Sequence, residues 1–109
     1  MVSDCVRESF LLLELIAHTK KPAVVVQVLQ KGGDILTNAI TEIVHNILFG
    51  RIGLTDKHKG RLAQVKPILR KLANKDISVR TRTAISKRNP GIIQSVIRIA
   101  LPTVKILHQ

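Results

Sequence analysis

The sequence contains no tryptophan and no tyrosine, and its two phenylalanines are Phe10 and Phe49. A core without large rings must be built from aliphatic side chains, and hydrophobic residues make up 45% of the 109 residues. That content excludes a disordered basic tail and suits one domain that spans residues 1–109. With so few aromatic rings, we expect no platform on which single-stranded bases stack.

Cysteine is equally scarce, and the residues with catalytic chemistry form no motif. Cys5 has no disulfide partner, which favours a reducing, intracellular compartment. There are no paired carboxylates, no nucleophile motif and no cofactor loop, and the four histidines show no metal-ligand spacing. The sequence therefore predicts no enzyme activity, no metal, no cofactor and no small-molecule substrate.

Long hydrophobic runs are missing as well. The most apolar stretch, Ile92–Leu107, contains two charged residues and Pro102, so it falls short of the roughly 20 apolar residues of a membrane-spanning helix. Asp4 and Glu8 lie where a signal peptide carries positive charge. We therefore expect a soluble protein.

Acidic residues are almost absent from the second half of the chain. Residues 1–50 contain four basic and five acidic residues, whereas residues 51–109 contain fourteen basic residues against Asp56 and Asp76. The net charge of +11 therefore comes from the second half. Such an asymmetry indicates a polyanionic partner, which is DNA, RNA or an anionic membrane surface.

The hydrophobic pattern that is present is helical. No stretch alternates strictly as a half-buried strand would, and hydrophobic residues recur at helical spacing between capping residues. This pattern predicts an all-α fold, a compact bundle of five to six short helices with no sheet. Its parts are near-neutral apolar helices in residues 1–50, a basic segment in residues 51–88 and an apolar C-terminal helix in residues 89–109.

Capping residues and prolines place the expected helices. The first half is expected to hold a helix from Ser3 to about His18, one from Pro22 to Lys31-Gly32-Gly33, and one over residues 35–49 between the caps Asp34 and Gly50. In the second half, Thr55 is expected to cap a helix from Asp56 to about Ala73, and Ser78 to cap a short helix that ends at about Arg88. Asn89 is expected to cap the last helix, from Pro90 to about Leu107. Because proline lacks an N–H group, we expect a kink or break near Lys66, before Pro67, and a kink at Pro102.

The basic segment is the candidate ligand site. A solvated helix face usually mixes charges of both signs, whereas residues 51–88 hold twelve basic residues and two acidic ones. This bias predicts sequence-independent binding of phosphates, with DNA favoured over RNA. The candidate nucleic-acid-binding residues are Lys57, Lys59, Arg61, Lys66, Arg70, Lys71, Lys75, Arg80, Arg82, Lys87 and Arg88.

One flank of the helix expected over residues 56–73 is the first place to test. At 100° per residue, Lys59, Lys66 and Arg70 fall together beside the apolar stripe. The neighbouring positions are small residues, which let a phosphate strand approach the helix closely: Gly60, Ala63 and Pro67.

The first and last helices are apolar over much of their circumference. Such a helix is a central core helix, a self-association surface or a membrane-interface segment. A homo-oligomer is expected, with self-association residues Leu11, Leu12, Leu15, Ile97 and Leu101. The alternative function is a structural assembly or membrane-active module whose basic face contacts anionic lipid or an acidic protein.

The order of features over residues 34–107 resembles a known family. Leu54-Thr55-Asp56-Lys57-His58-Lys59 leads to Leu69-Arg70-Lys71-Leu72-Ala73, then a basic run from Ser78 to Arg88 and an apolar tail from Gly91. This order is similar to that of small basic core- or capsid-associated proteins of Maverick/Polinton elements and adenovirus-related viruses. The resemblance implies packaging of a genome without base specificity, in a nucleus or a virion. It transfers no individual site residue.

Overall fold

A computed structural model describes the backbone of residues 4–108 and the side chains of residues 4–105. This part of the chain forms seven helices and no strand, which confirms the all-α prediction. The helices are α1 (Asp4–Glu8), α2 (Phe10–His18), α3 (Pro22–Leu48), α4 (Asp56–Ala63), α5 (Lys66–Ala73), α6 (Val79–Arg88) and α7 (Pro90–His108). Two of the six expected helices are each divided, and two others are joined in α3, which gives seven.

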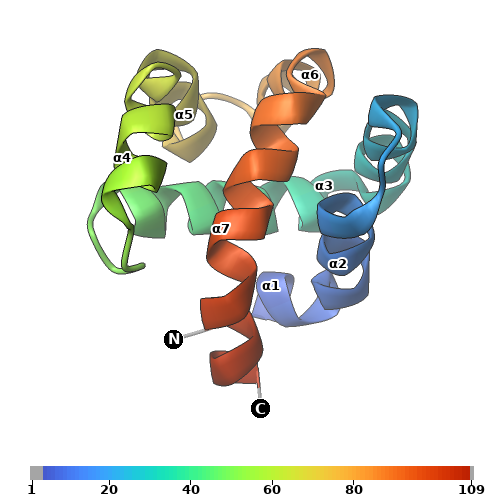
Figure 1. Ribbon diagram of the computed structural model, residues 1–109. Coiled ribbons are helices and arrows are strands. Elements are labelled where there is room, and N and C mark those ends of the chain that lie inside the picture. The colour runs from blue at the N-terminus through green and yellow to red at the C-terminus, as the bar shows by residue number, and fades with distance from the viewer. Residues whose placement is uncertain (1–3, 109) are drawn as a thin grey trace.

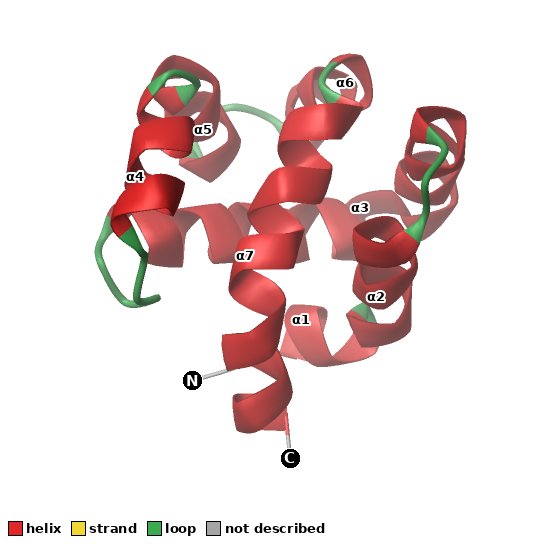
Figure 2. Cartoon of the chain, in the orientation of Figure 1, coloured by secondary structure: helices red, strands yellow, loops and turns green. Residues whose placement is uncertain are grey.

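Helix α3 is the centre of the bundle. It lies across the molecule, and α7 crosses it, with α4 and α5 on one side and α1 and α2 on the other (Figure 1). Short loops join the helices (Figure 2). The largest fully buried side chains are aliphatic, as expected from the composition, and they include Leu13, Leu29, Ile40, Leu69, Ile93 and Ile97.

The first division falls at Ser9, inside the helix expected to run to His18. Ser9 leaves the helical conformation at φ −93° and ψ 1°, and its side chain is buried. Both α1 and α2 pack against α3, so the chain bends between them to bury Val6 on one side and Leu13 on the other. No glycine or proline marks this bend, and the expected cap Ser3 lies outside the described residues.

The second feature of the fold is a bend within α3 at Gly33. Its φ of 62° and ψ of −153° interrupt the helix where a helix end was predicted. At Gly32, a Cβ atom would lie 2.6 Å from the Cβ of the buried Leu36, so the backbone passes too close there for any side chain. The pair Gly32-Gly33 thus lets one stretch of helix turn into the next.

Replacing Gly33 with alanine should destabilise the fold. An L residue is strained at this φ, so we expect Gly33→Ala to lower the free energy of unfolding by about 1–2 kcal/mol in urea titrations. Gly60→Ala is the matched control, because Gly60 lies within exposed α4 with open space around it and should gain about 0.5–1 kcal/mol. Equal stability of the Gly33 variant and the wild type would contradict the assignment of the bend.

Most predicted helix ends in the second half are confirmed. The Thr55 side chain accepts a hydrogen bond from the His58 N–H at 3.2 Å, and Ser78 accepts one from Thr81 at the same distance. The break near Lys66 is also confirmed, since α4 ends at Ala63 and α5 begins at Lys66 with Pro67 in its first turn.

The cap predicted at Asn89 is wrong. Its side-chain amide donates to the Ile85 carbonyl at 2.8 Å, so it satisfies the end of α6 instead of the start of α7. Helix α7 then continues through Pro102 without a break.

Helix α7 is held to α2 by polar contacts along one strip. Arg98 Nε donates to the Ala17 carbonyl at 2.6 Å, and Gln94 Nε2 donates to the Ile16 carbonyl at 2.9 Å. These donors satisfy carbonyl groups left free at the end of α2, where a cation also complements the helix dipole. A 3.2 Å ion pair between Lys105 and Glu14 lies farther along the same two helices.

Candidate nucleic-acid interface

The predicted flank of basic residues is distributed over two helices instead of one. Lys59 lies on α4, Lys66 and Arg70 lie on α5, and Lys75 lies in the loop that follows α5. All four side chains are exposed. The break before Pro67 ends the continuous helix on which their common phase was predicted, so their proximity depends on how α4 and α5 pack.

Two adjoining hollows bring these residues together. The smaller hollow, of about 290 Å³, lies between the end of α3, α4 and α5, and Lys59 and Lys66 line it. The larger hollow, of about 620 Å³, is lined by Lys66, Arg70 and Lys75. Because Lys66 borders both hollows, the four cations follow one another along one surface. We name this the α4–α5 surface: Lys59, Lys66, Arg70 and Lys75.

The four cations of the α4–α5 surface are not neutralised by ion pairs within residues 4–105. None of its four cations forms an ion pair with a carboxylate among the described residues, and the Lys105–Glu14 pair belongs to α7 and α2. Asp76 lines the larger hollow and reduces its charge without pairing. Like charges held together destabilise a fold, so a bound polyanion relieves their repulsion.

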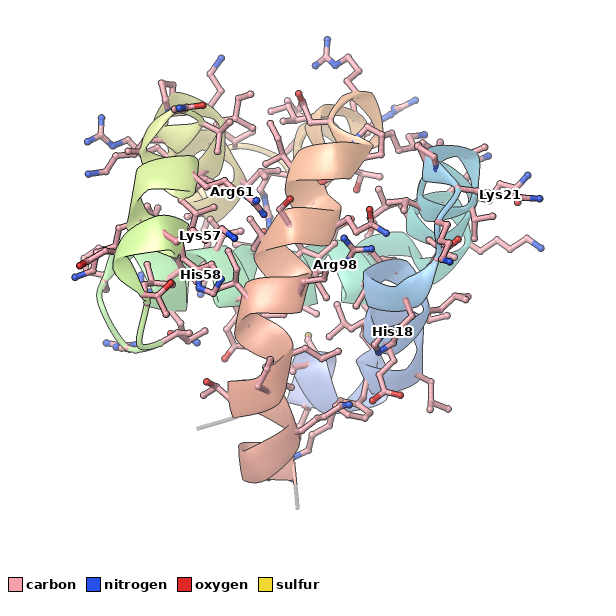
Figure 3. All side chains as sticks on the ribbon, in the orientation of Figure 1. His18, Lys21, Lys57, His58, Arg61 and Arg98 are labelled. Atoms are coloured by element: carbon pink, nitrogen blue, oxygen red, sulfur yellow. The ribbon has the colours of Figure 1, made fainter. Side chains whose placement is uncertain are left out.

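The other predicted cations do not share this surface. Lys57 and Arg61 extend from α4 toward α7 (Figure 3). Lys71 is exposed on α5, and it is not among the residues that line the two hollows. The three remaining surface cations lie on α6: Arg80, Lys87 and Arg88. The structure therefore brings four cations together on the α4–α5 surface and places the others elsewhere, with Arg80 and Lys87 beside a separate hollow.

The prediction that Arg82 is a nucleic-acid-binding residue is wrong, because its side chain is buried. Only 4% of its side chain is exposed, because it inserts between α6 and α3. Its Nε donates to the Ile77 carbonyl at 3.0 Å, and its Nη1 donates to Asn38 Oδ1 at 3.3 Å and to Thr41 Oγ1. These bonds use the guanidinium inside the protein, so Arg82 has a structural role and does not belong to the exposed cations.

The predicted self-association residues differ in exposure. Ile97 and Leu101 are buried in the core, which makes α7 a core helix and removes both residues from any surface patch. Leu12 is half-buried. Leu11 is 78% exposed and Leu15 is 47% exposed, so these two apolar side chains of α2 remain available to a partner.

Sequence reasoning missed an aromatic pair beside the basic residues. Phe49 is 67% exposed at the end of α3, and its ring stacks on His45 with 4.4 Å between the ring centroids and 30° between the planes. Both rings line the larger hollow with Lys66, Arg70 and Lys75. The spacing of four residues, which places His45 and Phe49 on one helix face, was the signal available in the sequence.

Two further observations concern the described residues alone. Among the side chains of residues 4–105, no three from His, Cys, Asp and Glu lie close enough to hold a metal ion. No helix in this part of the chain combines the length and hydropathy needed to cross a membrane.

Comparisons with known proteins give no relative: no family model, no curated protein and no solved structure matches the chain.

Proposed function

We propose that this protein binds nucleic acid without enzymatic activity and without reading base sequence, with DNA preferred over RNA. The observation that carries the proposal is the α4–α5 surface, four exposed and unpaired cations from two helices and a loop. Lysine and arginine side chains there neutralise phosphates and release the counterions condensed on the strand. Genome packaging inside a nucleus or a virion is the role that this activity suits.

The same surface could attract an anionic membrane, so the proposal needs a comparison of ligands. Binding of random-sequence duplex DNA and of phosphatidylserine vesicles should be titrated side by side at about 100 mM salt. The proposal predicts binding of the duplex with a Kd of roughly 10⁻⁴–10⁻⁶ M and no vesicle binding. Vesicle binding without duplex binding would favour the membrane alternative, which the burial of Val96, Ile97 and Leu101 in α7 already weakens.

Self-association is a second proposal, carried by the exposed Leu11 and Leu15 of α2. We expect Leu11→Arg to convert a dimer into a monomer, because a charge at the centre of an apolar contact cannot be desolvated cheaply. Sedimentation equilibrium measures the mass. Because Leu11 is exposed, its substitution should change the free energy of unfolding of the monomer by no more than about 0.5 kcal/mol. A wild-type chain that stays monomeric at high concentration would rule out this contact.

A further inference from the structure

The exposed ring of Phe49 is a costly surface for a protein to leave in water. It is one of the two phenylalanines of the chain, and the other, Phe10, is packed against the core. Exposed aromatic rings beside cations are a common arrangement in sites that bind single-stranded nucleic acid, because every base offers a π-face and every linkage a phosphate.

The local backbone holds Phe49 at the surface. Gly50 follows it with φ 72°, and the Gly50 N–H donates to the Ile47 carbonyl at 3.2 Å. The Arg51 N–H donates to the Asn46 carbonyl at 2.8 Å, which completes the two-bond termination of a Schellman motif. The chain turns away after Phe49, so the ring stays at the open end of α3 with His45 behind it.

The ring and the cations share one cavity. Phe49 and His45 border the hollow of about 620 Å³ from the side of α3, and Lys66, Arg70 and Lys75 border it from the side of α5 and its following loop. One face of the Phe49 ring lies on His45, which leaves the other face for a flat apolar group. The hollow thus combines a stacking surface with positive charge for a neighbouring phosphate.

We propose that this hollow binds an unpaired nucleobase on Phe49 while Lys66, Arg70 and Lys75 hold the flanking phosphates. The inference rests on the proposed function and adds a preference, among nucleic acids, for single strands, strand ends or unpaired bases. A base inside a duplex is stacked on its neighbours and cannot lie on Phe49. Single-stranded nucleic acid should therefore bind more tightly than a duplex with the same number of phosphates.

Abasic oligonucleotides separate stacking from charge. We expect wild-type protein to bind a 20-residue oligo(dT) or oligo(U) about tenfold more tightly than an abasic strand of the same length. Phe49→Ala should remove this preference and leave binding of the abasic strand and of duplex DNA unchanged. Phe49→Trp should keep the preference, and its fluorescence, the sole tryptophan signal, should be quenched by the oligo(dT) and not by the abasic strand.

The Lys59/Lys66/Arg70 triple alanine variant is the control for charge, and it should weaken binding of all three ligands together. Equal affinity of wild type and Phe49→Ala for oligo(dT) would overturn the inference. If Phe49 proves not to matter but the abasic strand and the duplex still bind with a steep salt dependence, the proposed function stands and only the inference about base stacking fails. Absence of binding to every strand would overturn both.

Discussion

Replacing Lys59, Lys66 and Arg70 together with alanine should weaken duplex DNA binding by about two orders of magnitude near 100 mM salt. Each phosphate that a protein neutralises contributes close to one unit to the slope of log affinity against log salt, so three lost contacts remove most of three units. These side chains are exposed and line adjoining hollows, so their loss leaves the core intact. Fluorescence anisotropy with a labelled random-sequence duplex measures the change.

A charge-matched control comes from the other side of the molecule. Lys20, Lys21 and Lys31 are also exposed, and Lys21 lies near the start of α3, away from α4 (Figure 3). Their triple alanine variant has the same net charge as the first variant and should bind with an affinity within about threefold of wild type. Equal losses in the two variants would mean that net charge alone, and no particular surface, controls binding.

The largest expected effect on stability belongs to Arg82. Arg82→Ala removes the donors that satisfy Asn38, Thr41 and the Ile77 carbonyl, and it leaves a cavity between α6 and α3. Losing buried hydrogen bonds and side-chain volume at once should lower the free energy of unfolding by about 3 kcal/mol. In a chain of this length the thermal midpoint should fall by roughly 10–20 °C, as followed by circular dichroism.

Arg80 provides the control for this prediction, since it lies two residues away on the same helix and is exposed. Arg80→Ala should change stability by less than about 0.5 kcal/mol. A larger loss of unfolding free energy in Arg80→Ala than in Arg82→Ala would contradict the structural role of Arg82. A folded Arg82 variant should also retain the wild-type salt dependence of DNA binding, because Arg82 is 4% exposed and its guanidinium bonds within the protein.

The helix ends that local chemistry determines were predictable from the sequence. Thr55 and Ser78 cap their helices with their own side chains, Gly33 and Gly50 take positive φ, and Pro67 lies just after the break between α4 and α5. Each of these features depends on one residue and its nearest neighbours, so a single sequence carries it.

The features that depend on packing were not predicted. The bend at Ser9 follows from burying α1 and α2 against α3, and no local residue requires it. Arg82 was grouped with surface cations, although it shares the buried face of α6 with Ile85 and Ser86, three and four positions on. Asn89 could serve either adjoining helix, and the geometry of the turn decides in favour of α6.

Only part of the candidate site could be predicted from the sequence. Charge and helical phase identified Lys59, Lys66 and Arg70. Only the packing of α5 against the end of α3 places Lys66 and Arg70 beside Phe49 and His45, and these two rings come from a part of the sequence with little net charge. Because the rings and the cations belong to different segments, the sequence pattern of either segment could not predict that they meet.

The salt dependence of binding to random-sequence duplex DNA tests the central claim most directly. Affinity should be measured between about 50 and 200 mM salt for the wild type and for the Lys59/Lys66/Arg70 triple variant. We predict a steep linear decrease of log affinity with log salt for the wild type, and a slope smaller by about two to three units for the variant. A nearly flat wild-type slope, or parallel slopes for the two proteins, would contradict phosphate binding by the α4–α5 surface.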